Sequence, residues 1–230
     1  MIKYEIISTG SNGNCIIVND YLMLDCGLSY SKIKKYLDKI KVIFCCHEHQ
    51  DHLKKTTIKK VAYEKPNIKF IVGNFLVNEL VELGVNKKNI ITFDIGKWYD
   101  IGVFKTKMDY LFHDVPNNCL HIEFKNGEKL FYATDTSSID HIQAKNYTLY
   151  LIEANYDTDD ELRKKIKEYK EQGKYCYYER VLNSHLSQLQ AINWLDKNKD
   201  ANSEYCFIHQ HINKEDKNEW RRILFIRFKK

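Results

Sequence analysis

Short apolar runs alternate with turn residues at the start of the chain, and this pattern predicts an antiparallel opening. Strands are expected at 4–8, 15–18 and 21–25, with turn residues between them. Apolar side chains then recur at helical spacing from Ile33 to Ile40. The continuous apolar run 42–46 predicts a buried strand that ends directly before a group of histidines.

Helical and strand patterns continue to alternate along the rest of the chain, which predicts an α/β fold. Further strands are expected at 68–72, 89–93, 103–110, 119–124, 129–133, 148–152 and 205–208. Further helices are expected at 56–63, at 74–83, from a cap at Thr158 to Gly173, and from a cap at Ser187 through Leu195. Two β-rich halves, each followed by helices, indicate two packed sheets with helices on their outer faces. We expect one domain over 1–230.

Composition places the chain among ordinary globular proteins, with 43% hydrophobic and 29% charged residues. No apolar run approaches the roughly 18 residues of a membrane span, and 1–5 reads as a strand rather than a secretory signal. We therefore expect a cytoplasmic protein. The net charge of +5 and the pI near 8.6 fall short of the pI above about 9 that is typical of a nucleic-acid-binding domain. The seven cysteines form no C-x-x-C pair, which favours buried free thiols over a disulfide framework.

The segment 47–52 carries the strongest chemical signal. It reads His47-Glu48-His49-Gln50-Asp51-His52, which puts several metal-binding side chains close together. In extended backbone, alternate residues share a face, so His47 and His49 can hold one ion. If the chain then turns into a helix, Asp51 and His52 point toward a second ion.

Further ligands are expected at the ends of later strands, namely His113, Asp135 and His211. These residues complete two groups joined by Asp135 as a bridging carboxylate: His47, His49 and His113 on one metal, and Asp51, His52 and His211 on the other. His209 is the alternative to His211, whereas His121 and His141 are expected to be structural. Asp25 follows a strand, and we expect it to orient a ligand histidine by accepting that histidine's other N–H.

At these residues the chain resembles the metallo-β-lactamase fold superfamily of metallohydrolases. Asp25 matches the first motif, 47–52 the second, His113 the third, Asp135 the fourth and His211 the fifth. The resemblance implies a four-layer αββα sandwich with two divalent ions, zinc or else manganese, at the sheet edges. The true β-lactamases usually carry Cys where this chain has Asp135, so the resemblance favours the phosphodiesterase branch.

Within that branch, several motifs resemble a small bacterial exonuclease-like group and the phage anti-Pycsar cyclic-nucleotide phosphodiesterases. These motifs are 8–15 (STGSNGNC), 113–116 (HDVP), 153–155 (EAN) and 185–187 (HLS). Cys46, Tyr156 and Ser184 stand where the group often has Thr, His and Gly. Relatives of this kind are commonly homodimers, so a homodimer is also expected.

The expected function is phosphodiester hydrolysis, with Asp51 orienting the nucleophile while it ligates metal. His185 is similar in placement to the proton-donating histidine of transfer-RNA 3′-processing relatives; its alternative role is to cap a helix. The favoured substrates are 3′,5′-cyclic mononucleotides such as cCMP and cUMP, or cAMP and cGMP, opened to nucleoside monophosphates in phage evasion of Pycsar immunity. The alternatives are a nuclease acting on RNA or DNA and a partner-binding module that has lost catalysis. The mild positive charge favours a small nucleotide.

Overall fold

Within residues 1–210, the part of the chain that the computed structural model describes, the strands form two six-stranded sheets. The first sheet contains the strands of the N-terminal half in chain order. They are β1 (Tyr4–Ser8), β2 (Cys15–Val18), β3 (Leu22–Leu24), β4 (Val42–Cys45), β5 (Lys69–Val72) and β6 (Ile90–Ile91). The antiparallel pairing of β1 with β2 and of β2 with β3 confirms the opening that the sequence predicts.

The second sheet contains the later strands, with β12 and β7 at its edges. Its strands are β7 (Tyr99–Asp100), β8 (Phe104–Leu111), β9 (Asn117–Phe124), β10 (Lys129–Ala133), β11 (Leu149–Glu153) and β12 (Glu204–Ile208). The chain therefore completes one sheet before it builds the other.

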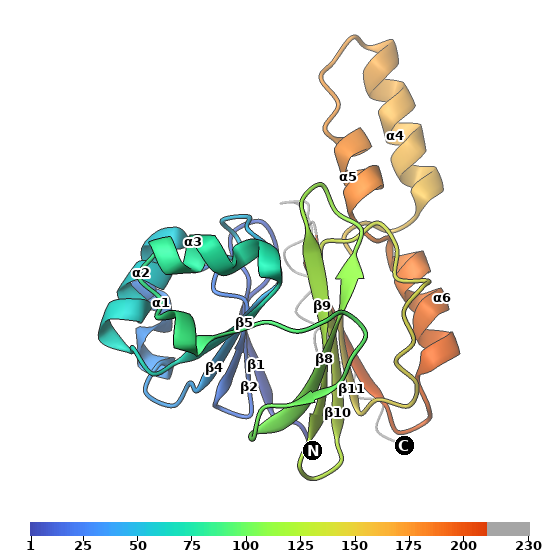
Figure 1. The fold of residues 1–230 in the computed structure, drawn as a ribbon. Helices are drawn as coiled ribbons and strands as arrows, with labels where there is room; N and C mark the ends of the chain where they lie inside the picture. Colours follow the sequence, from blue (N-terminus) through green and yellow to red (C-terminus); the bar gives the residue numbers. More distant parts are fainter. Residues whose placement is uncertain (211–230) are drawn as a thin grey trace.

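Helices cover the outer faces of both sheets (Figure 1). Those beside the first sheet are α1 (Tyr30–Ile33), α2 (Lys55–Glu64) and α3 (Val77–Glu82), with 3₁₀ turns at Lys34–Tyr36, Asn74–Leu76 and Lys87–Asn89. Those of the second half are α4 (Asp159–Glu171), α5 (Tyr178–Ser184) and α6 (Gln188–Asn198). α6 packs on the second sheet, whereas α4 and α5 form an arm that projects from it (Figure 1). Among residues 1–210, no helix is long and apolar enough to cross a membrane.

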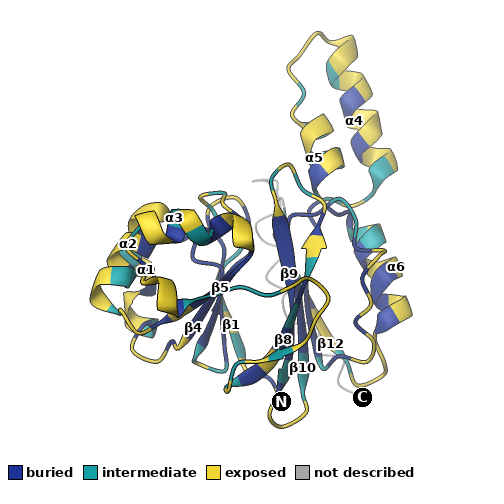
Figure 2. Cartoon of the chain, in the orientation of Figure 1, coloured by how far each residue is buried: buried dark blue, intermediate teal, exposed yellow. Residues whose placement is uncertain are grey.

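The alternation of side chains along buried strands explains the layers. All four residues of β4 are buried, as expected for a strand covered on both faces (Figure 2). Val42 and Phe44 pack between the two sheets, while Ile43 and Cys45 pack under α1, α2 and α3. A third apolar cluster joins the second sheet to α6. The αββα sandwich implied by the sequence is confirmed.

Strand direction brings the ends of many strands to one edge of the molecule. β3, β4, β5 and β6 are parallel to one another, and so are β10, β11 and β12. β8 runs in the same direction as β10, because β9 is antiparallel to both. The residues that follow the carboxyl ends of these strands can therefore meet between the two sheets.

The helical predictions differ from the structure in three places, one of which is that the predicted helix 74–83 begins as a 3₁₀ turn at Asn74–Leu76 before α3. The periodic segment from Ile33 to Ile40 does not form one helix, because α1 passes into a 3₁₀ turn that ends at Tyr36. α5 was not predicted, since Tyr178–Ser184 buries one residue and therefore shows little periodicity. Ser187 caps α6 with the expected capping box.

Candidate metal centre

The histidine-rich loop follows β4 and is held in place by two other loops, one between β1 and β2 that carries Asn14 and one after β3 that carries Cys26. Asn14 and Cys26 bond the backbone of 51–52: Asn14 N donates to Asp51 O at 2.6 Å, and Cys26 N donates to His52 O at 2.8 Å. Gly27 allows this close approach, because a Cβ built there would lie 1.7 Å from Asp51 O. The loop therefore presents its histidines from a fixed backbone.

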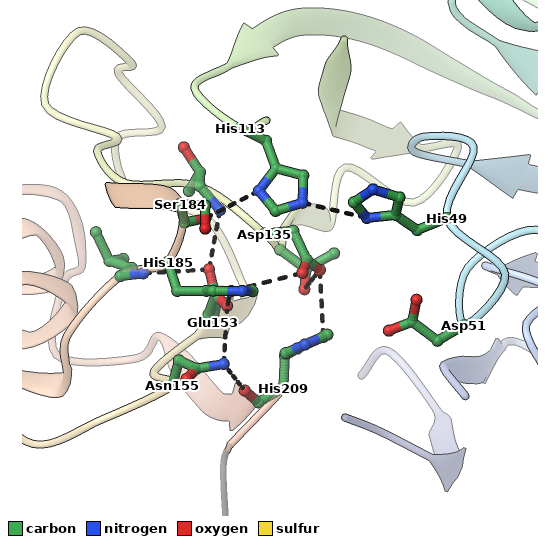
Figure 3. A network of polar contacts seen from close by, with 12 residues as sticks. His49, Asp51, His113, Asp135, Glu153, Asn155, Ser184, His185 and His209 are labelled. Carbon is green, nitrogen blue, oxygen red and sulfur yellow. Dashed lines mark hydrogen bonds and ion pairs between the residues drawn. The ribbon is translucent and has the colours of Figure 1, made fainter. Parts of the chain in front are cut away.

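The first group of ligand-type side chains is His47, His49 and His113, which the sequence assigned to one metal. Their ligand atoms lie within 4.8 Å of one another, although His113 comes from the other sheet. His113 Nδ1 donates to Ser184 O at 3.0 Å, so the nitrogen that faces His49 Nδ1, 3.4 Å away, is Nε2 (Figure 3). His47 is fully buried, and burial together with nearby His52 lowers its pKa well below the ordinary value.

The second group is Asp51, His52 and His209, whose ligand atoms also lie within 4.8 Å of one another. His209 follows β12, and its ring stacks on that of His52, with 5.3 Å between ring centroids and an angle of 11° between the ring planes. The sequence analysis expected His211, or alternatively His209, as the last ligand of this group. In the structure His209 lies at this position. His211 lies outside the described residues.

Asp135, the expected bridging carboxylate, contacts two histidines of the second group. Its Oδ2 is 2.9 Å from His52 Nε2 and 3.2 Å from His209 Nδ1, as Figure 3 shows for His209. Burial alone would raise the pKa of Asp135, but His209 and His52 lower it well below the ordinary value. The carboxylate is therefore ionised and lies against two nitrogen atoms of the second group. Its charge also partly offsets the lowering of the pKa of His47 and of His113 in the first group.

His185 approaches Asp135 from the end of α5. Its Nδ1 lies 2.6 Å from Glu153 Oε1 and 3.5 Å from Asp135 Oδ1 (Figure 3). Although burial favours the neutral ring, the charge and hydrogen bond of Glu153 raise the pKa of His185 to about 9. A histidine that is protonated at neutral pH can donate a proton to a leaving group.

Asp25 orients His52, a member of the second group, through the Nδ1 atom of its ring. Its Oδ2 accepts from His52 Nδ1 at 2.6 Å and from the hydroxyl of Tyr132 at 2.6 Å, and its Oδ1 accepts from Cys46 N at 3.0 Å. The Nδ1 proton of His52 is thereby fixed, which leaves Nε2 to face the site. Cys46 Sγ lies 3.2 Å from Asp25 Oδ2.

Three residues at this edge have left-handed backbone conformations that favour glycine. They are Asp25 (φ 59°), Asp135 (φ 55°) and His209 (φ 51°). Such conformations cost about 1 kcal/mol or more in a non-glycine residue, and they concentrate at functional sites. Asp25 and His209 directly follow a strand and Asp135 comes one residue further on, where the turn aims the side chain between the sheets.

Three residues of the site were not assigned a role from the sequence. Glu153 ends the buried strand β11 and accepts from Thr136 N as well as from His185. Asn14 Nδ2 lies 2.8 Å from His52 Nε2. Asp114 Oδ1 lies 3.0 Å from His113 Nε2. Glu153 could have been found from the sequence as a carboxylate at the end of an apolar strand. Asn14 and Asp114 lie inside motifs whose roles become clear only once the fold is known.

The donor set fits divalent metal ions. His47 Nε2 is buried without a hydrogen-bond partner, and His209 Nδ1 lacks hydrogen-bond geometry toward Asp135. An unpartnered buried nitrogen is costly unless something binds it. Imidazole nitrogens and carboxylate oxygens together are typical ligands of zinc and of manganese.

Comparison with known proteins also assigns the chain to a family of metal-dependent hydrolases. The family model described as "Beta-lactamase superfamily domain" matches residues 21–210. The chain is 23% identical over 174 residues to exodeoxyribonuclease YycJ of Bacillus anthracis, which covers 69% of this chain and 64% of that protein. It is 30% identical over 105 residues to cytidine monophosphate-N-acetylneuraminic acid hydroxylase of Sus scrofa, over 43% of this chain. The matched region spans only 24% of the length of that hydroxylase.

Two solved structures share the fold. The metallo-β-lactamase fold protein YhfI from Bacillus subtilis has a TM-score of 0.68 and 18% identity, covering 94% of this chain and 89% of that one. The short form of human tRNase Z (ELAC1) has a TM-score of 0.63 and 16% identity, covering 91% and 92%. The family match, the layered sheets and the ligand-type residues at their edge agree, and the chain belongs to the β-lactamase superfamily of metal-dependent hydrolases, where it fits the phosphodiesterase branch.

Proposed function

We propose that this chain is a dinuclear metal-dependent phosphodiesterase. The observation that carries the proposal is the presence of two groups of ligand-type side chains at one edge of the sheets, with Asp135 against the second group and His185 beside the same carboxylate. His47, His49 and His113 would hold one ion, and Asp51, His52 and His209 the other. Asp135, which contacts His52 and His209, would add a carboxylate ligand.

The chain's own residues would divide the remaining work. When bound, the ions supply Lewis acidity that activates water and offsets charge on the phosphoryl group. Asp51 Oδ2 lies 3.5 Å from His52 Nε2 and would orient the nucleophile. His185, held by Glu153, would give a proton to the leaving oxygen. Asp25 would keep the proton of His52 on Nδ1.

The first candidate substrate is a 3′,5′-cyclic mononucleotide, opened to a nucleoside monophosphate. This choice is supported by the resemblance to the anti-Pycsar phosphodiesterases and by the modest net charge of +5. In that role the protein would act in the cytoplasm of the infected cell as a homodimer. The in-line attack needs only the phosphodiester, so base preference would come from residues around the site.

A nuclease is the second candidate. The observation in its favour is the similarity to exodeoxyribonuclease YycJ, which extends over 69% of this chain. Both candidates use the same phosphodiester chemistry and differ in the size of the substrate.

The experiment is incubation of zinc- or manganese-loaded protein with 3′,5′-cyclic mononucleotides, cyclic dinucleotides, and single- and double-stranded RNA and DNA, with products separated by chromatography. Asp135→Ala and chelator-treated protein are the controls. Ring opening of cyclic mononucleotides would support the first candidate, and release of mononucleotides from nucleic acid alone would support the second. No hydrolysis of any phosphodiester by fully metal-loaded protein would refute the proposal.

A further inference from the structure

Arg180 brings a permanent positive charge to the edge of the metal centre. It lies on α5, and its Nε and Nη2 are 3.1 and 2.7 Å from Oδ2 of Asp114. The Arg180 side chain is 67% exposed and that of Asp114 is 36% exposed. The pair therefore faces solvent, unlike the buried contacts of Asp25 and Glu153.

The other oxygen of Asp114 faces the first group of histidines. Oδ1 lies 3.0 Å from His113 Nε2 and 3.5 Å from His49 Nε2. A single carboxylate thus separates the guanidinium of Arg180 from two nitrogens that are assigned to metal binding. An anion bound at those nitrogens would come within the reach of Arg180.

The backbone also couples Arg180 to the site. Ser184 O, near the end of the same helix, accepts from His113 Nδ1, and His185 follows directly. The segment 180–185 therefore carries Arg180, the residue that orients His113, and the proposed proton donor. A phosphate held by Arg180 would be placed relative to both histidines by one short helix.

The charge of the site shows why such a cation is useful. The carboxylates in and around the cluster repel an anionic substrate: they belong to Asp51, Asp114, Asp135 and Glu153. A guanidinium can bind a carboxylate or a phosphate, because its parallel N–H groups can donate to two oxygens of the anion or converge on one. Arg180 is already bound to a carboxylate, which is the closest side-chain analogue of a phosphate oxygen pair.

We propose that Arg180 binds a non-bridging phosphate oxygen of the nucleotide substrate, and that Asp114 holds the guanidinium in place before the phosphate arrives. The inference rests on the proposed function because it assigns a phosphate-binding residue to that site. The competing role is structural, in which the ion pair only fastens the α4–α5 arm to the end of β8.

The test measures binding rather than turnover. Isothermal titration calorimetry gives the affinity of metal-loaded protein for uridine 5′-monophosphate and for uridine, in the wild type, Arg180→Ala, Arg180→Lys and Lys174→Ala. Lys174 lies in the turn between α4 and α5, so Lys174→Ala removes the same charge from the far end of the arm. Metal content and melting temperature are measured for each protein.

Arg180→Ala should weaken binding of the nucleotide by about tenfold or more while leaving uridine unaffected, since it removes a charge-assisted hydrogen bond. Arg180→Lys should fall between the wild type and Arg180→Ala, because it keeps the charge and loses the planar donors. Lys174→Ala should change binding by less than about twofold, because salt screens distant charges. Equal nucleotide affinities for Arg180→Ala and Lys174→Ala, or equal losses for nucleotide and uridine, would overturn the inference. The result does not depend on hydrolysis, so a phosphate site without phosphodiesterase activity would refute the proposed function alone.

Discussion

Oδ2 of Asp25 lies 2.6 Å from Nδ1 of His52, and both side chains are fully buried. Asp25 follows β3 and His52 ends the loop after β4, so two neighbouring parallel strands place the pair. The contact decides which ring nitrogen of His52 faces the site. Burial alone would lower the pKa of His52, but Cys46, Asp135 and Asp25 raise it well above the ordinary value. The surroundings of the His52 ring therefore favour a positive charge on it.

Asp25→Asn should weaken binding of the metal at the second group by about 10- to 100-fold, because it removes the carboxylate that orients His52 and makes it a better ligand. Competition with a chromophoric chelator would measure the affinity. Asp20→Asn is the matched control, since that carboxylate pairs with Lys3 on the surface. Unchanged metal affinity in Asp25→Asn would show that the ring of His52 is positioned by other contacts.

His185→Ala should keep both metals and lose roughly 10²- to 10⁴-fold in kcat on a substrate with an alkoxide leaving group. The loss should be much smaller for bis-p-nitrophenyl phosphate, because p-nitrophenolate leaves without protonation. Steady-state kinetics on both substrates, with elemental analysis of the protein, test this prediction. Equal losses on the two substrates would mean that His185 positions phosphate instead.

Glu153→Gln should act through His185 and not on the metals. Its Oε1 accepts from His185 Nδ1, so losing the charge lowers the pKa of His185 from about 9 toward its ordinary value. The alkaline limb of the pH profile of kcat should therefore move to lower pH. A profile identical to that of the wild type would separate Glu153 from the proton transfer.

Gly27→Ala should destabilise the fold by about 1–3 kcal/mol, because its Cβ would collide with the carbonyl of Asp51 and force the two loops apart. The displacement reaches Asp51, so metal affinity should fall too. Gly127→Ala is the control: its φ of 82° is strained for alanine, but nothing lies near the added Cβ. Urea unfolding and metal titration should show a stability loss in both variants and a metal defect in Gly27→Ala alone.

His121 provides a pH-dependent stability term away from the metal centre. Burial lowers its pKa below 6.5, despite the opposing effect of Asp109. As pH falls below about 6.5, the unfolded chain takes up a proton that the folded His121 does not, so stability is lost, with a slope of up to about 1.4 kcal/mol per pH unit. His121→Gln should therefore lose less stability than the wild type between pH 7 and pH 5 in urea unfolding experiments. Parallel curves for the two proteins would contradict this expectation.

Local sequence patterns were sufficient for the layers and for most of the cluster. The loop 47–52 contains most of its metal-ligand candidates within six positions, and His113 and Asp135 each stand two positions after the end of a recognisable strand. The sequence left His209 and His211 as alternatives, because both follow the predicted strand 205–208. His209 has a positive φ and its ring stacks on that of His52, whereas His211 lies outside the described residues.

Contacts between distant segments could not be predicted. Arg180 meets Asp114 across 66 positions, and Tyr132 meets Asp25 across 107. Neither pair leaves a spacing signal, since the Tyr132–Asp25 contact depends on how the two sheets pack and the Arg180–Asp114 contact depends on where α5 lies relative to the end of β8. Glu153 is a similar case: its carboxylate is fully buried, and it is tolerated there only because His185 and two backbone N–H groups bond it.

The division of the strands between two sheets has a mechanical consequence. Over residues 1–210 the chain passes from the first sheet to the second once, between β6 and β7. His47 and His49 belong to one side of that crossing and His113 to the other, and the second group is split in the same way between His52 and His209. Each ion would therefore act as a cross-link between two halves that are otherwise joined by a single connection, a shared apolar interface and hydrogen bonds such as that of Tyr132 to Asp25. The force needed to pull the two halves apart would then rise with the number of bound ions. The mechanical strength of the protein would therefore depend on how fully it is loaded with metal.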